Sequence, residues 1–163
     1  MTVPGRTPRE ETGSVSDWDS HLPADTPGEL AVVEVRTSAS AALIPTIRAV
    51  ASDLAARADF DLDAISDLRM AVDEACATLV DVAAPATMLQ CTFRVHPEHI
   101  EVHAHVRGGS ADAAVSTDTF GWRVLQTLAD NVEALRQDSA DGADPAGPTV
   151  GIRLDKHAGA PPR

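Results

Sequence analysis

The stretch "DLRMAVDEACATLV", residues 67–80, carries a carboxylate and a hydroxyl group one helical turn apart. At about 100° per residue, its apolar side chains repeat on one face of a helix. Glu74 and Thr78 are i, i+4 neighbours on a flank beside that face, together with Asp67 and Asp81. From this spacing alone, the solvated flank of an amphipathic helix is the simpler interpretation, and a paired chemical role is the alternative.

Cysteine and histidine show no metal-ligand spacing. Cys76 and Cys91 lack a CxxC pattern, and each falls on the apolar face of an expected element, which predicts two buried and inert thiols. Their burial argues against easy oxidation and therefore against redox control. His103 and His105 form a close pair on one face of an expected strand, without a cysteine or clustered carboxylates beside them. A metal site is not expected there.

The chain reads as a strand, two helices, two strands, a loop, a third helix and two final strands. The patterns predict strands at 29–36, 87–95, 99–106, 131–137 and 149–156, and helices at 41–58, from after a break at 59–63 to about 82, and at 120–130. Pro45 is compatible with the first helix only in its first turn. The glycine-rich and polar segment 107–118 predicts a flexible loop. The third helix is expected to turn four side chains inward, namely Phe120, Val124, Leu125 and Leu128.

This order of elements predicts an α+β fold, a two-layer sandwich in which a mostly antiparallel sheet carries three helices on one face. The other face is expected to be solvated and to carry Thr92, Arg94, Glu101, His103 and His105. One domain, residues 28–156, is expected between a disordered arm at 1–27 and a flexible tail at 157–163.

The charge balance bears on the class of partner. Lys and Arg number 13 against 25 Asp and Glu, a net charge of −12, which argues against direct binding of nucleic acid. A basic protein partner is favoured, although surplus carboxylates also serve solubility. No run of about 18 apolar residues and no signal-like segment occurs. We therefore expect a cytoplasmic location and no contact with a membrane.

The segment "LRMAVDEACATLV", residues 68–80, closely resembles a helix of the RsbW-type anti-sigma factors and serine kinases. In that family, part of the histidine-kinase-like ATPase superfamily, the helix reads approximately L-R-L-A-V-x-E-A-C-x-N. The resemblance covers about residues 29–156, because the order of elements is the same. It implies ATP and magnesium as cofactors, Glu74 as general base for phosphoryl transfer, and Thr78 in the place of a magnesium-binding asparagine.

The family's nucleotide motifs are only partly present. Val106 stands where the D-x-G-x-G motif has an aspartate that accepts a hydrogen bond from adenine, whereas Gly108 is kept and Ser110 replaces the second glycine. The glycine-rich lid is reduced to Gly121, between two aromatic residues. With a threonine as the metal ligand as well, these departures predict a degenerate pocket with weak or absent ATP binding.

The resemblance also implies partner binding. Family members sequester a stress or sporulation type sigma factor, are captured by a small anti-anti-sigma factor, and are commonly homodimers. Arg48 aligns with an arginine that the family uses at the partner surface, while Ile44 replaces a polar family residue. An exposed arginine without a partner is the alternative for Arg48.

Three functions follow. The chain is expected to be an anti-sigma factor that regulates transcription and is released by its antagonist. The first alternative is an active serine kinase that phosphorylates the antagonist, with Glu74 as base, Thr78 as magnesium ligand, and a lid from Gly108 to Thr119 that orders on nucleotide binding. The second is an adaptor domain unrelated to the family.

Overall fold

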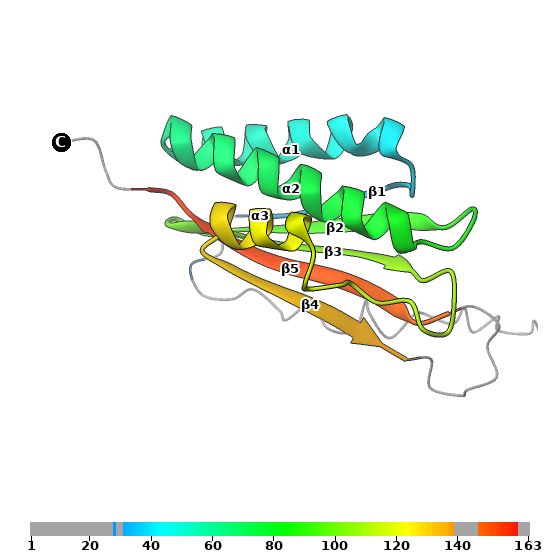
Figure 1. The fold of residues 1–163 in the computed structure, drawn as a ribbon. Coiled ribbons are helices and arrows are strands. Elements are labelled where there is room, and N and C mark those ends of the chain that lie inside the picture. The colour runs from blue at the N-terminus through cyan, green and yellow to red at the C-terminus, as the bar shows by residue number, and fades with distance from the viewer. Residues whose placement is uncertain (1–27, 29–30, 139–146, 160–163) are drawn as a thin grey trace, which may run out of the picture.

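Five antiparallel strands form one sheet in the residues that the computed structural model describes, namely 28, 31–138 and 147–159 (Figure 1). The strands are β1 (Ala31–Ser38), β2 (Met88–Val95), β3 (His99–Arg107), β4 (Asn131–Gln137) and β5 (Thr149–His157). Their order across the sheet is β1-β2-β3-β5-β4, so β1 and β4 are the edge strands. The helices cover one face only, which confirms the predicted two-layer α+β sandwich (Figure 1).

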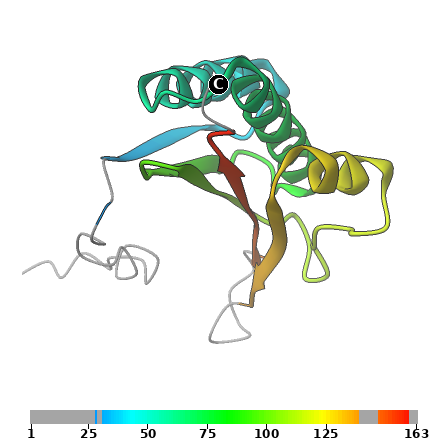
Figure 2. The same ribbon diagram turned by 90° about the vertical axis from the view of Figure 1, so that its left-hand side faces the viewer.

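The helix layer places α2 between two neighbours. A short 3-10 turn, η2 (Ala41–Leu43), leads into α1 (Ile44–Arg57), which has Pro45 in its first turn as predicted. Helix α2 (Leu62–Val82) begins at Asp61, whose carboxylate accepts a hydrogen bond from the Ala64 amide at 2.7 Å. Helix α3 (Phe120–Leu128) lies on the other side of α2 from α1, toward β5 and β4 (Figure 2).

The core lies between the two layers. Its largest fully buried side chains come from every helix and from most strands, for example Ile47, Leu68, Leu79, Phe93, Leu125 and Leu154. Cys76 of α2 and Cys91 of β2 are both buried there, as predicted, with their Sγ atoms 3.9 Å apart. The contact with Cys91 and burial raise the pKa of the Cys76 thiol, so this thiol stays protonated.

The prediction that Phe120 points inward was wrong. Phe120 is 81% exposed, whereas Trp122 is 7% exposed. Thr119 caps α3 by accepting a hydrogen bond from the Trp122 amide at 3.1 Å, so Phe120 is the first helical residue. Trp122 and Leu125, three residues apart, form the face that packs on the core, and Phe120 lies about 200° around the helix from Trp122.

The outward face of the sheet is less open than expected at Thr92. This residue is 8% exposed because it stands in a central row of the sheet, flanked by Glu34 of β1 and His103 of β3. Thr92 was therefore wrongly expected to be solvated.

The last strand ends one residue later than the strand predicted at 149–156. Strand β5 continues to His157, and the Ala158 amide donates to the Glu98 carbonyl at 2.8 Å. The Ala158 carbonyl in turn accepts from the Asp61 amide at 3.1 Å, and the rest of the tail expected at 157–163, residues 160–163, lies outside the described residues. The arm expected at 1–27 lies outside the described residues. Among the described helices, none is both long and apolar enough to cross a bilayer.

Candidate functional site

Glu74 and Gly121, which belong to separate motifs in the sequence, lie against each other in the structure. A Cβ built on Gly121 would overlap the Glu74 carboxylate, so any larger residue at this position requires the Glu74 side chain to move. Thr78 follows one turn later on α2 and is half-buried. The structure thus brings the predicted base and the remaining lid glycine together.

The Glu74 carboxylate faces the N-terminal turn of α3. The first amides of a helix have no partner within the helix, and the helix dipole adds partial positive charge there. Such a turn stabilises an anion, which in a nucleotide-binding protein is a phosphate group. Here the side chain beside Gly121 is the chain's own carboxylate.

Gly108, the second predicted nucleotide-binding glycine, is also packed against the chain itself. Its amide donates to the Pro148 carbonyl at 2.8 Å, and a Cβ built on it would lie 2.5 Å from the Ala113 Cβ atom. Ala113 is buried, and the Gly109 amide donates to the Val82 carbonyl at the end of α2 at 2.9 Å. The space that a glycine leaves for a ligand is filled by Ala113.

Val106, in the position of the family's aspartate, belongs to the core. It is 1% exposed and faces Val150 across β3 and β5. Its side chain offers no acceptor for an adenine amino group.

These residues do not fit ATP. The base-binding acceptor is absent at Val106, and the glycines 108 and 121 face Ala113 and Glu74. For magnesium, the described part of the chain holds no cluster of three or more His, Cys, Asp or Glu side chains placed to bind a metal. Glu74 and Thr78 remain as two oxygen-bearing side chains on one flank of α2.

Arg48 of α1 lies on the opposite flank of α2 and is paired. Its Nη1 atom donates to Oδ2 of Asp73 at 2.7 Å, and the two side chains are 39% and 33% exposed. Ile44 is buried, so its apolar character serves the core. Sequence reasoning missed Asp73, and no pattern in the sequence indicates this pairing across two helices.

Lys156 is a second polar residue that sequence reasoning missed. Its Nζ atom donates to Asp67 of α2 at 2.8 Å and to the Leu128 carbonyl at the end of α3 at 2.9 Å. It joins β5, α2 and α3 at one point. The alternation of β5 is a signal that could have found it, because Lys156 stands in the same row as the buried Ile152 and Leu154.

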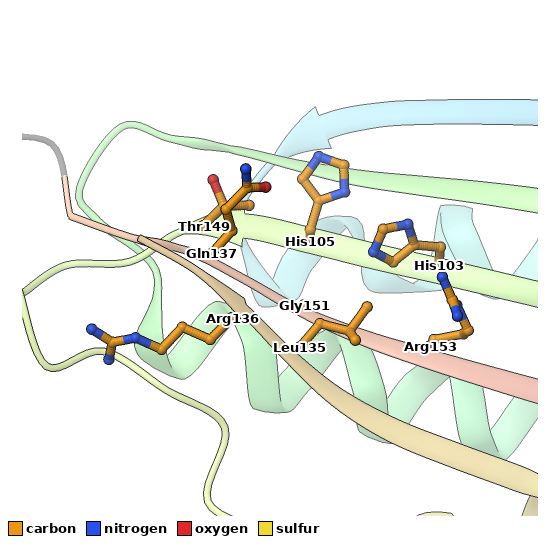
Figure 3. A pocket seen from close by; sticks show the side chains of 8 residues that line it. All are labelled: His103, His105, Leu135, Arg136, Gln137, Thr149, Gly151 and Arg153. Atoms are coloured by element: carbon orange, nitrogen blue, oxygen red, sulfur yellow. The ribbon is translucent and has the colours of Figure 1, made fainter. Parts of the chain in front are cut away.

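The face of the sheet without helices has a separate hollow of about 380 Å³ over β3, β5 and β4 (Figure 3). His103 and His105 line it beside Gly151, where a Cβ would lie 3.3 Å from the His105 side chain. Burial, with the neighbouring His103 and Arg36, lowers the pKa of His105 to about 4. Burial and the charges of Arg153 and Arg94 lower the pKa of His103 as well. Both histidines are therefore neutral at pH 7.

Comparison with known proteins identifies relatives of this chain. The histidine kinase-like ATPase domain matches residues 37–144, a range that includes α1, α2, α3 and the candidate residues on them. The anti-sigma-F factor RsbW of Mycobacterium tuberculosis, from strains CDC 1551 / Oshkosh and ATCC 25618 / H37Rv, is 32% identical over 133 residues. These residues cover 80% of this chain and 76% of that protein.

Proposed function

Because this chain belongs to the histidine kinase-like ATPase family, we propose that it is an anti-sigma factor that sequesters an RNA polymerase sigma factor without the help of a nucleotide. The sigma factor is held away from the polymerase in a reversible complex. An anti-anti-sigma factor releases it by occupying an overlapping surface of this protein.

The observation that carries the proposal is the Arg48–Asp73 pair, in a chain similar to an anti-sigma-F factor. Both side chains are about one third exposed, so a partner can reach them and exchange one charged contact for another. The net charge of −12 supports a basic partner, since it raises the rate at which oppositely charged surfaces meet. Arg48 would then supply a local positive charge that sets the position of the partner.

The lack of fit for ATP supports binding without chemistry. Glu74 and Ala113 lie against the glycines that would need to face phosphates. If the protein does not phosphorylate its antagonist, control of the antagonist comes from another source, such as a separate kinase or the antagonist's own redox state.

An active serine kinase is the second candidate, and one observation favours it. The Glu74 carboxylate lies beside a helix N-terminus, where a base could face a phosphate and an attacking hydroxyl group. In that case Glu74→Ala abolishes transfer of phosphate to the antagonist and leaves sigma binding largely intact. Phosphate incorporation that is unchanged by this substitution would show that Glu74 is not the base. Family membership removes the unrelated adaptor from consideration.

Calorimetric titration tests the proposal directly. The purified protein is titrated with a candidate sigma factor, with ATP and magnesium, and with the sigma factor in the presence of both. We expect saturable sigma binding that ATP does not change, and no heat from ATP alone. Saturable micromolar binding of ATP would favour the kinase, and no binding of any sigma factor of the source organism would overturn the anti-sigma function.

A further inference from the structure

The polar segment that follows β3 is hydrogen-bonded to the edge strand β4 through Arg136. Residues 108–119 read "GGSADAAVSTDT", a composition that predicts a flexible loop. In the structure, Arg136 of β4 donates from Nη1 to the Ala113 carbonyl at 2.9 Å and from Nη2 to the Ala111 carbonyl at 2.7 Å. The planar fork of a guanidinium suits two neighbouring acceptors and holds them in one geometry.

The position of Arg136 in β4 explains how it reaches the segment. It pairs with the buried Val150 of β5, so it stands in the row that faces the helices. Figure 3 shows its side chain extending away from His103 and His105, which lie on the other face. Asp138 accepts two further bonds from the guanidinium, at 2.8 and 3.0 Å, and keeps its plane oriented.

Other hydrogen bonds hold the two ends of the segment, and the Ala113 amide donates to the Ser110 carbonyl at 3.1 Å in a local turn. At its start, Gly108 and Gly109 donate to Pro148 and Val82. At its end, the Thr119 hydroxyl donates to the Ser116 carbonyl at 3.4 Å and caps α3. In the middle of the segment, Ala113 and Val115 pack on the core, and the two Arg136 bonds join the backbone at residues 111 and 113 to β4.

The segment leads directly into an exposed aromatic side chain. Phe120 follows the capping Thr119 and is 81% exposed, although phenylalanine is usually buried. Exposed aromatic residues on a rigid element are typical anchors of protein interfaces. The segment reaches the first turn of α3 through Thr119, whose hydroxyl donates to the Ser116 carbonyl and accepts from the Trp122 amide.

We propose that Arg136 is a positioning residue that fixes the segment 108–119, so that Phe120 projects as an anchor for the sigma factor. This inference rests on the proposed function. The matching surface of the sigma factor is an apolar pocket bordered by basic side chains, because Glu74 lies against Gly121, Asp118 is two residues before Phe120 in the sequence, and the protein has a net charge of −12. The surface around Phe120 is then formed before the partner arrives, which reduces the entropy lost on binding.

Hydrogen exchange tests the attachment without any partner. In Arg136→Ala, amides of the segment, including Ala113, should exchange at least about tenfold faster than in the wild type, because two charge-assisted bonds are lost. Arg136→Lys keeps the charge without the fork and should give an intermediate rate. Arg57→Ala is the matched control, since Arg57 pairs with Asp53 on the surface of α1, away from the segment. Exchange that is unchanged in Arg136→Ala would overturn the inference.

A double-mutant cycle tests the action through Phe120. Phe120→Ala and Arg136→Ala should each weaken sigma binding about tenfold, and the double variant should lose little more than either single variant. Additive losses would show that Arg136 does not act through Phe120 and would overturn the inference. A merely structural role of Arg136 would weaken binding in the Phe120→Ala background as well.

The two experiments separate the possible failures. If the wild-type protein binds no sigma factor, the proposed function fails, and the exchange experiment still decides whether Arg136 holds the segment. If sigma binds and neither variant changes its affinity, the proposed function stands and this inference fails.

Discussion

Helix α2 has two flanks with different surroundings. Asp73 lies on the flank toward α1, and the next residue, Glu74, lies on the flank toward α3. Toward α1, Asp73 receives Arg48 in a pair that remains about one third exposed. Toward α3, Glu74 lies against the backbone of Gly121, and Asp67 receives Lys156, which is 13% exposed. The α1 flank therefore keeps charges that a partner can reach, while the α3 flank is packed against the protein itself. This difference supports the proposal that the protein binds its partner on the α1 flank without the help of a nucleotide.

The largest effect is expected at Gly108, which is packed tightly against Ala113. Gly108→Val should lower the free energy of unfolding by about 3 kcal/mol, because the new side chain meets Ala113 and the Pro148 carbonyl. Chemical denaturation measures this change, with the exposed Ala114→Val as control. A loss below about 0.5 kcal/mol would mean that the space beside Gly108 can open and that Ala113 does not fill it.

Lys156→Met should cost about 2 kcal/mol of stability. The substitution keeps the aliphatic stem but leaves Asp67 and the Leu128 carbonyl without their donor. Thermal unfolding checks the loss, and Asp67→Asn serves as the milder partner variant. If Lys156→Met is neutral, the junction of β5, α2 and α3 does not depend on this cation.

Arg48→Ala tests the α1 flank of α2. The affinity for the sigma factor should fall about tenfold, whereas stability should change by less than about 1 kcal/mol, because a half-exposed ion pair contributes little to folding. Titration calorimetry measures the affinity, and Arg57→Ala is the control arginine on the same helix. Equal affinities for Arg48→Ala and the wild type would remove the α1 flank from the partner surface.

The smallest effect concerns the contact between Gly121 and Glu74. Gly121→Ala should cost about 1 kcal/mol, because its Cβ displaces the Glu74 carboxylate, which is the flexible end of a side chain. In a Glu74→Ala background the same substitution should be close to neutral or stabilising. Equal costs in both backgrounds would show that Glu74 does not lie against Gly121 in solution.

The apolar patterns were sufficient for most of the fold. Periods of two and 3.6 residues identified the five strands and three helices, and Pro45 marked the first turn of α1 as expected. Phe120 was misplaced because an apolar residue at a helix start satisfies the same pattern whether it lies inside or outside. The cap at Thr119 and the burial of Trp122 decide which face packs on the core.

The candidate site divides in a similar way. Glu74, Thr78, Gly108 and Gly121 were found by their resemblance to family motifs, and their roles as base, metal ligand and nucleotide-binding residues stay predictions. Arg48 was found in the same manner, but its partner Asp73 was not. The bonds of Arg136 were also missed, because an arginine at a strand edge has no local pattern that indicates its acceptors.

The sequence by itself determined the family, the order of the elements and the residue types at the family's motifs, because these depend on local periodicity and short motifs. Only the tertiary structure decided that Gly121 faces Glu74, that Ala113 fills the space beside Gly108, and that Arg136 holds the segment before α3. These contacts join residues far apart in the chain. Their geometry depends on how the helices pack over the twisted sheet, which no local pattern encodes.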